Sequence, residues 1–444
     1  MSPTLKPIIK ELGAGLILRR SSPEDAEALA AFCGEIHSEE AGKSDPIISA
    51  WTRDLLTRPH PRFHPDDFTV IEKTSTGRIV STSNLISQTW TYEGIPFGVG
   101  RPELVGTLPE YRNRGLIRLQ FEEIHRWSEE RGELVQAITG IPYYYRLFGY
   151  EMAIDLDGCR AGFAPHVPQL RPGQSEAYTF RAATDADLPF IASTYGQGHN
   201  RYPIACVRDQ AIWHYELSGR DPMVTQVLEV IEDRRGRTVG ILRYLPQLMK
   251  NTVSLTMFEL VPGVSWLEIT PAVIRYLWKV GQAYSSTQDS NCMAFRFALG
   301  EAHPAYEACR ERLPQVQPSY AWYVRVPDLP RFIKAIAPAL EQRLAGSIAC
   351  GYSGEVRMSF YRSGLRWRFE QGRLAEVEPW MPGERELEGD IAFPGLTFLQ
   401  LLFGYRSLAN LRAAFPDCWY NSGEARVLME ALFPRKPSQV IGLS

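Results

Sequence analysis

Residues 105–118 read VGTLPEYRNRGLIR, and the organisation of the surrounding chain can be worked out from this stretch. An apolar, strand-like segment at 104–108 reaches a turn at Pro109, and an arginine-rich loop centred on Gly115 follows. The loop opens an amphipathic helix, whose apolar positions repeat at i, i+4 and i+7: Ile117, Phe121 and Ile124. The pattern predicts a strand, a glycine loop and a helix in direct succession.

A glycine loop at a helix N-terminus is suited to bind an anion. The first N–H groups of a helix have no intrahelical partner, and the helix dipole favours negative charge there. Gly115 lets a phosphate approach closely, and three arginines add planar donors that match phosphate oxygens: Arg112, Arg114 and Arg118. The sequence therefore predicts a phosphorylated cofactor. The alternative is a basic surface turn that only caps the helix.

Composition limits the class of protein. A chain of 444 residues predicts two to four domains, and 44% hydrophobic with 22% charged residues is typical of a soluble globular protein. The net charge of −3 gives no general attraction to nucleic acid or to an anionic membrane. No apolar run approaches the ~18 residues of a membrane span, and residues 1–15 lack a signal-peptide core. The seven scattered cysteines form no CxxC pair, which favours the cytoplasm.

Two segments of the chain share one layout. Residues 16–37 and 178–199 each read as a strand ending in Arg, a Ser or Thr cap, acidic residues and an apolar helical stripe. A predicted hairpin follows each of them, at 68–86 and 226–245. We interpret this as a duplication of one α/β unit. In the second copy the basic cluster is missing from residues 258–278, so this copy is predicted to be a structural partner.

The remaining segments complete the expected domain plan. Residues 161–177 carry Pro and Gly breakers and are predicted to be a linker. Helical segments and alternating, meander-like strands after about Val326 predict an α+β unit. The expected domains are therefore 1–160, which holds the cofactor site, 178–325, and 326–444.

Three motifs together resemble a known family. The RNRGLI segment at 112–117, with VGT upstream and YRLFGY at 145–150 downstream, resembles the acetyl-CoA site of GNAT-fold N-acetyltransferases. The whole layout is similar to the enhanced-intracellular-survival (Eis) group. The resemblance implies an α/β (α+β) fold with two tandem GNAT-like domains, the second degenerate, followed by a sterol-carrier-protein-like α+β domain.

The resemblance also implies roles for individual residues. The thioester and pantetheine of acetyl-CoA would lie along Val105, Gly106 and Thr107. The pyrophosphate would lie on the loop and first helical turn: Arg112, Asn113, Arg114, Gly115, Leu116, Ile117 and Arg118. The next strand would meet the cofactor at Thr139, Gly140 and Ile141. Ile117 departs from the Gly or Ala that most GNAT loops carry there, which the Eis-like group tolerates.

Two residues would carry the chemistry. By the resemblance, Tyr145 is the general acid, and the carboxylate of Ser444 is the base. The apolar approach at 440–443 is compatible with a docked tail. The alternatives are core packing for Tyr145, with Tyr144 as its replacement, and a frayed terminus for Ser444.

The expected function is acetyl-CoA-dependent transfer of an acetyl group to a primary amine of a small molecule or a lysine side chain. The alternative is a non-catalytic protein that binds acyl-CoA or a lipid. Homo-oligomers are implied by the Eis-like resemblance. No metal is expected, because the prolines around His60 and His64 forbid the helix that would align this HxxxH pair.

Overall fold

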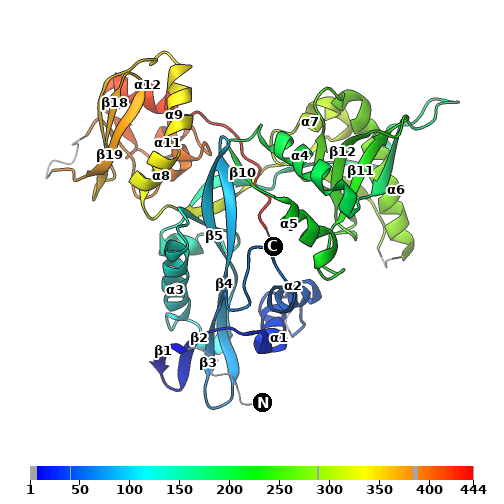
Figure 1. Ribbon diagram of the computed structural model, residues 1–444, viewed down its shortest axis with the longest axis horizontal. Coiled ribbons are helices and arrows are strands. Elements are labelled where there is room, and N and C mark those ends of the chain that lie inside the picture. Colours follow the sequence, from blue (N-terminus) through cyan, green and yellow to red (C-terminus); the bar gives the residue numbers. More distant parts are fainter. Residues whose placement is uncertain (1–7, 41, 288–289, 384–388, 444) are drawn as a thin grey trace.

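The computed structural model describes residues 8–40, 42–287, 290–383 and 389–443, and it is a mixed α/β structure. The structure has three lobes, and each lobe contains one β-sheet (Figure 1). One lobe is built mainly from the N-terminal part of the chain, one from the middle and one from the C-terminal part. The last residues return from the C-terminal lobe to the centre of the molecule, between the other two lobes (Figure 1).

The first sheet has the strand order β1-β2-β3-β4-β5-β6-β16-β7, and β10 pairs with β4 beside this path. Its strands are β1 (Ile8–Gly13), β2 (Leu16–Arg20), β3 (Phe68–Lys73), β4 (Arg78–Tyr92), β5 (Ile95–Thr107), β6 (Val135–Ile138), β7 (Glu151–Leu156), β10 (Ile204–Cys206) and β16 (Tyr320–Arg325). The long β4–β5 hairpin is its spine. Helices α1 (Ala26–Ile36) and α2 (Pro46–Thr57) pack together on one side of this spine, and α3 (Leu116–Glu130) lies on the other (Figure 1).

Residues 104–130 fold into the strand, glycine loop and helix that their pattern predicts. Strand β5 ends at Thr107, a single 3₁₀ turn covers Pro109–Tyr111, and α3 starts after Gly115. Phe121 and Ile124 are buried beneath α3, because the spacing of apolar residues places both on the face that meets the sheet.

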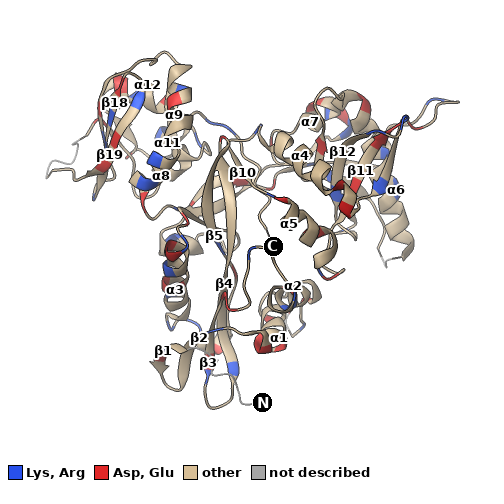
Figure 2. Ribbon diagram, viewed as in Figure 1, with Lys and Arg blue, Asp and Glu red and all other residues tan. Residues whose placement is uncertain are grey.

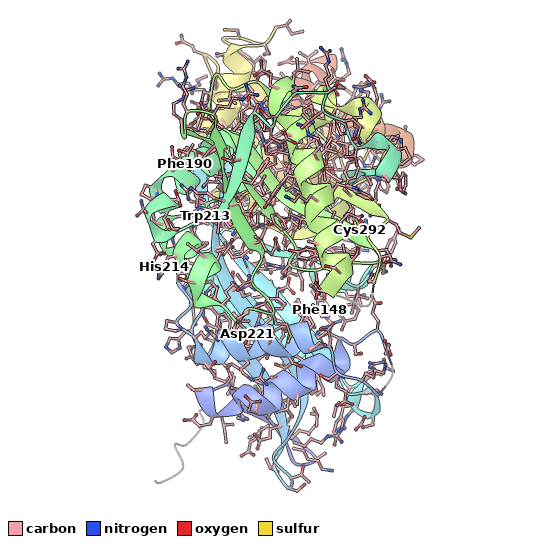
Figure 3. The ribbon with its side chains drawn as sticks, turned by 90° about the vertical axis from the view of Figure 1, so that its right-hand side faces the viewer. Phe148, Phe190, Trp213, His214, Asp221 and Cys292 are labelled. Carbon is pink, nitrogen blue, oxygen red and sulfur yellow. The ribbon has the colours of Figure 1, made fainter. Side chains whose placement is uncertain are left out.

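The second sheet runs β15-β8-β14-β13-β12-β11-β9. Its strands are β8 (Cys159–Phe163), β9 (Tyr178–Ala182), β11 (Val227–Asp233), β12 (Thr238–Tyr244), β13 (Thr252–Leu260), β14 (Ala294–Phe297) and β15 (Gln315–Gln317). Its helices are α4 (Leu188–His199), α5 (Gln210–His214), α6 (Trp266–Thr287) and α7 (Pro304–Ala308). Seen from the side, α5 carries Trp213 and His214, and the loop with Asp221 reaches the α1–α2 helices (Figure 3). There the Asp221 N–H donates to the Asp54 carboxylate at 2.7 Å.

The two segments that share a sequence layout also begin with the same ion-pair arrangement. Arg19 at the end of β2 forms a two-bond pair with Asp25 at 2.8 and 2.9 Å, and Arg181 on β9 forms the same pair with Asp187 at 2.8 Å. Each aspartate also accepts from the backbone N–H of a Ser or Thr three residues earlier, which fixes the strand-to-helix turn. The similarity read from the sequence thus extends to side-chain geometry.

The third sheet has the order β19-β18-β17-β20-β21. Its strands are β17 (Gly354–Ser359), β18 (Gly364–Glu370), β19 (Arg373–Trp380), β20 (Ile391–Ala392) and β21 (Trp419–Tyr420). Its helices are α8 (Leu329–Ala335), α9 (Ala337–Ala345), α10 (Phe398–Leu402), α11 (Leu408–Ala414) and α12 (Gly423–Leu432). This sheet and its helices enclose an aromatic-rich core that is continuous with apolar residues of the first sheet, among them Trp90 and Trp322.

Strands are exchanged across the expected domain limits. Strand β16 lies between β6 and β7 in the first sheet, although it follows the second sheet in the sequence. Strand β10 pairs with β4 through Ala205 and Thr91. Strand β8, which includes the first residues of the predicted 161–177 linker, belongs to the second sheet. The first two units are therefore interlocked through backbone hydrogen bonds.

Basic and acidic residues are interspersed over all three lobes (Figure 2). In the part of the chain that the structure describes, no helix is both long and apolar enough to cross a membrane.

Candidate active site

A cavity of about 950 Å³ opens between β5, β6 and the start of α3. Strands β5 and β6 are parallel, but they pair only at Val99–Val135 and Gly100–Gln136 before they separate. A β-bulge lies in β5 beyond this point, where Leu104 has a φ of 50° and two β5 residues face one residue of β4. Because the bulge bends β5, the end of the strand diverges from β6, and the cavity fills the resulting wedge.

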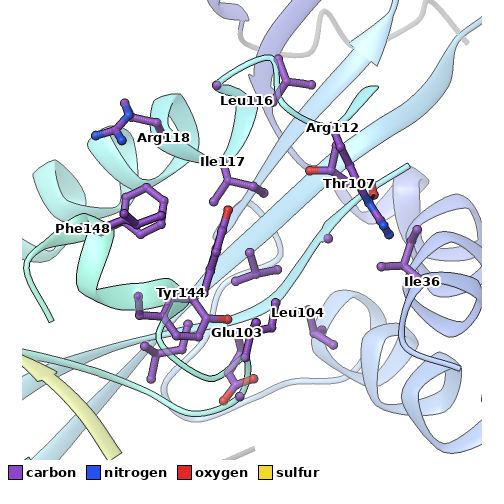
Figure 4. Close-up of a pocket in the computed structure, with 18 of the residues that line it drawn as sticks. Ile36, Glu103, Leu104, Thr107, Arg112, Leu116, Ile117, Arg118, Tyr144 and Phe148 are labelled. Carbon is purple, nitrogen blue, oxygen red and sulfur yellow. Dashed lines mark hydrogen bonds between the residues drawn. The ribbon is translucent and has the colours of Figure 1, made fainter. Parts of the chain in front are cut away.

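The helix N-terminus forms the cationic end of this cavity. Gly115 has a φ of 74°, in the left-handed region, and it caps α3. The N–H of Leu119 donates to the Gly115 carbonyl at 3.2 Å as the first bond of the helix, so the N–H groups of the three residues between them have no partner within it. Arg112, Arg114 and Arg118 line the cavity around this helix start, and Figure 4 shows Arg112 and Arg118 on opposite sides of it. These donors suit the phosphates of a nucleotide cofactor.

Buried polar contacts fix α3 relative to the strands. The Gln120 side chain accepts from the Thr69 hydroxyl at 2.9 Å and donates to the Ser81 hydroxyl at 2.7 Å. Ser81 in turn bonds to the Thr107 hydroxyl at 2.7 Å, at the end of β5. Since both the helix and the strand end are held by one network, the width of the cavity is set by the fold.

The middle of the cavity is lined by aromatic side chains that follow β6. The Tyr145 ring packs on Phe121 with centroids 6.0 Å apart and on Tyr323 at 5.6 Å. Burial raises the pKa of Tyr145 well above its usual value, and the nearby Glu103 carboxylate adds to the rise. The phenol therefore stays protonated at neutral pH and can donate a proton.

An acidic end lies opposite the arginines, and sequence reasoning missed it. Glu103 lines the cavity and pairs with Arg101 at 2.5 Å; in Figure 4 it lies at the far end from Arg118. His37, which directly follows α1, lines the cavity as well. Burial lowers the pKa of His37, so its imidazole is neutral at pH 7. Within the described structure its Nε2 is buried without a hydrogen-bond partner.

Glycine at position 106 makes this acidic end possible. A β-carbon added to Gly106 would lie 2.8 Å from Cγ2 of Ile36, so only a residue without a side chain lets α1 approach β5 this closely. The close approach brings His37 to the cavity. The sequence offered one signal for this arrangement. His37 ends the predicted helical segment at 16–37, and Gly106 lies in the strand-like segment that precedes the arginine-rich loop.

All thirteen residues predicted to hold the cofactor line this one cavity, and so does Tyr145. They come from three separate segments: Val105 to Thr107, Arg112 to Arg118, and Thr139 to Ile141. The fallback Tyr144 lines the cavity too. Ser444 lies outside the described residues. Among the residues that are described, no group of three or more His, Cys, Asp or Glu is placed to hold a metal ion.

The second sheet has its own cluster of buried polar and aromatic side chains around His303. His303 Nε2 donates to the Phe258 carbonyl on β13 at 2.9 Å, and Trp266 packs on His303 with centroids 5.0 Å apart. Arg201 and Glu259 form a two-bond ion pair beside them, at 2.8 and 2.5 Å. These side chains lie beside β13, and residues 258–278 carry no basic loop like the one around Gly115.

Comparisons with known proteins agree with this geometry. Residues 38–153 match the family described as "Acetyltransferase (GNAT) domain". No curated protein matches the sequence.

Solved structures match over almost the whole chain. A GCN5-related N-acetyltransferase from Kribbella flavida is 17% identical, with a TM-score of 0.65 over 97% of this chain and 98% of that chain. Eis1 from Mycobacterium abscessus is 15% identical, with a TM-score of 0.59 over 96% and 99%. The N-myristoyltransferase of Saccharomyces cerevisiae, solved with bound myristoyl-CoA, is 11% identical, with a TM-score of 0.51 over 73% and 81%. Residues 38–153 are therefore similar to a GNAT acetyltransferase domain, and the chain has a fold similar to that of solved GNAT N-acetyltransferases.

Proposed function

We propose that this protein transfers the acetyl group of acetyl-CoA to a primary amine on a small molecule or a lysine side chain. The observation that carries the proposal is the single cavity with a cationic end, a protonated tyrosine and an acidic end. A phosphorylated thioester and a cationic amine need these two opposite ends. The activity rests on the match of residues 38–153 to the GNAT domain.

The cofactor is assigned to the arginine end and the wedge. Its pyrophosphate would accept from the free N–H groups at the start of α3, with Arg114 and Arg118 as side-chain donors. The pantetheine would extend along Val105 to Thr107, where β5 has left β6. The thioester would then lie near Gly140 and Tyr145, which are neighbours in the lining of the cavity.

The acceptor amine is assigned to the acidic end. An alkylammonium with a pKa near 10.4 is only about one part in 10³ neutral at pH 7, which costs roughly 4–5 kcal/mol. Glu103 offers a carboxylate to the ammonium, and the site must then remove a proton from it. Tyr145 would donate a proton to the departing thiolate of CoA.

Two groups are candidates for the proton acceptor. The terminal carboxylate of Ser444 is the assignment that the family resemblance implies. His37 is the candidate that the cavity itself offers, because it is neutral and its Nε2 has no partner in the described structure. Extending the chain beyond Ser444, which converts this carboxylate into an amide, and replacing His37 by Gln separate the two, since only loss of the true acceptor moves the acidic limb of the pH–rate profile.

The decisive experiment measures thiol release. The protein is mixed with acetyl-CoA and a panel of polyamines, aminoglycosides and lysine peptides, and free CoA is followed. Release that depends on the amine supports the transferase. Tight binding of acetyl-CoA without release on any amine would instead indicate the non-catalytic acyl-CoA-binding alternative.

The finer layout is part of the same proposal. The repeated Arg19–Asp25 and Arg181–Asp187 pairs support a degenerate second GNAT-like unit. The α+β composition of residues 326–444 supports a sterol-carrier-like third unit. A cytoplasmic location and a homo-oligomer complete the proposal, and size-exclusion chromatography with light scattering tests the latter.

A further inference from the structure

The last described residues, 438–443, form a strap that contacts the first sheet, the core shared by the first and third sheets, and Arg208 in the segment after β10. The Ser438 N–H donates to the Asp155 carboxylate on β7 at 3.0 Å. Val440 and Leu443 are buried in the core that the first and third sheets share. Figure 1 shows this segment running from the third lobe to the centre of the molecule. Its side chains and backbone are thus held along most of its length.

A buried arginine of the second unit binds the backbone of the strap. Arg208 Nη2 donates to the carbonyls of Ile441 at 3.0 Å and Gly442 at 3.1 Å. Its other terminal nitrogen pairs with Glu216, and Arg243 pairs with the second oxygen of the same carboxylate at 2.8 Å. The Arg208 side chain is 1% exposed. A buried guanidinium with all these partners is held in one orientation.

The next carbonyl of the strap leads to the cavity. The Leu443 carbonyl accepts from Arg101 and from the Gln88 side chain, the latter at 3.3 Å. Arg101 Nη2 pairs with Glu103 at 2.5 Å, and Glu103 lines the acidic end of the cavity. The Arg101 guanidinium also lies 5.1 Å from the ring centroid of Trp322. Arg101 is therefore shared between the strap and the Glu103 carboxylate.

We propose that Arg208 is a positioning residue for the active site of the first unit. It fixes the strap, the strap fixes Arg101, and Arg101 fixes the Glu103 carboxylate that receives the acceptor amine. Arg208 lies outside residues 38–153, so a residue beyond the matched domain contributes to the proposed site. The inference rests on the proposed function, because it assigns the amine to Glu103.

The chain carries its own probe of the strap. The Leu443 N–H donates to the sulfur of Cys206, which is 1% exposed. Cys350 is exposed and serves as the internal reference for alkylation, and Cys33, fully buried in the first unit, reports unfolding. The rate at which iodoacetamide alkylates Cys206, measured by mass spectrometry, therefore reports whether the strap has detached from Cys206. The measurement does not require enzymatic turnover.

Two pairs of variants distinguish the effect of displacing the strap from the effect of lowering the stability of the whole protein. R208Q removes the strap contacts and leaves Glu216 paired with Arg243, whereas R243Q disturbs the same buried network and spares the strap. G442A would place a β-carbon 2.8 Å from Arg101 Nη1 and 2.9 Å from the Trp322 ring, whereas a β-carbon on Gly423 meets nothing within 4 Å. G423A is therefore the matched control for G442A.

We expect the strap variants to weaken the use of the amine without weakening the binding of acetyl-CoA. R208Q and G442A should label Cys206 faster than the wild type while Cys33 stays protected, and they should raise the KM for the amine about tenfold. The Kd for acetyl-CoA should not change, and R243Q and G423A should behave like the wild type. R208K, which keeps the charge but lacks the planar fork that binds the carbonyls and Glu216 through different nitrogens, should recover part of the KM. Adding R208Q to E103Q should raise the amine KM no further, since both act on one group.

Three outcomes would overturn the inference. One is an active R208Q protein with an unchanged amine KM, and another is an equal rise in R243Q. The third is full additivity of R208Q and E103Q. A wild-type protein that binds acetyl-CoA but acetylates no amine would overturn the proposed function as well, and the Cys206 labelling would still show whether Arg208 holds the strap.

Discussion

The hydroxyl of Tyr145 lies beside Gly140, since a β-carbon built on Gly140 would stand 3.7 Å from it. Gly140 follows β6 with a φ of 117°, a conformation that favours glycine. The strand end therefore passes the tyrosine without a side chain between them, and space remains for a thioester.

Replacing Tyr145 by Phe tests the role of this hydroxyl. We expect kcat to fall by ~10²-fold or more, because a general acid contributes about that much, while the Kd for acetyl-CoA stays the same. Tyr150→Phe is the matched control: this buried hydroxyl bonds to His125 at 2.9 Å and does not line the cavity. Stopped-flow or thiol-release assays on both variants provide the measurement. Equal rates in Y145F and the wild type would remove the assignment.

Replacing Gly115 by Ala tests the anion site. The left-handed backbone costs an alanine roughly 1–2 kcal/mol, and relief of that strain would turn the N–H groups of α3 away from the phosphates. We expect acetyl-CoA to bind about tenfold more weakly by calorimetry. Gly132 follows the other end of α3 with a φ of 73°, so Gly132→Ala carries the same strain away from the cavity. Equal losses of affinity in the two variants would contradict a cofactor site at Gly115.

The arginine end should be sensitive to single charges and to salt. Truncating Arg114 or Arg118 to Ala should weaken acetyl-CoA binding roughly 5- to 30-fold, as expected for one charge-assisted hydrogen bond. Arg126 lies on the exposed side of the same helix, paired with Glu123 and Glu130, and its truncation should leave the affinity unchanged. The comparison is made by titration at two ionic strengths, and the loss should shrink at high salt. No loss in either variant would place the phosphates elsewhere.

Buried histidines predict a pH dependence of stability. Burial lowers the pKa of His125 to about 3 and that of His60 to about 4. Below pH 6.5 the unfolded chain binds protons at these positions and the folded chain does not, so the free energy of unfolding falls as the pH falls. Each group contributes up to about 1.4 kcal/mol per pH unit. Urea titrations between pH 7 and pH 5 should show a shallower decline for His125→Gln than for the wild type, and identical slopes would contradict this account.

Local signals carried most of what the sequence could predict. The strand, glycine loop and helix around Gly115 follow from residue spacing and backbone preference alone. The caps at Ser22 and Thr184 likewise placed the two strand-to-helix turns. Family resemblance, and not spacing, selected Tyr145 and the β6 residues that share the cavity.

Contacts between residues far apart in the chain could not be predicted from the sequence. Nothing near Tyr320 indicates that β16 belongs between β6 and β7, because strand pairing across so many residues leaves no local pattern. Glu103 and Arg101 read as ordinary alternating polar residues on a strand. Their importance comes from the Leu443 carbonyl, which reaches them from the far end of the chain.

The position of β16 has a consequence for biosynthesis. The first sheet contains a gap between β6 and β7 until Tyr320–Arg325 has emerged from the ribosome. At 5–20 residues per second, translation of residues 157–319 takes roughly 8–30 s. During that interval two apolar strands stand with unpaired edges, so the nascent chain depends on chaperones or on rapid docking of its later segments to avoid aggregation.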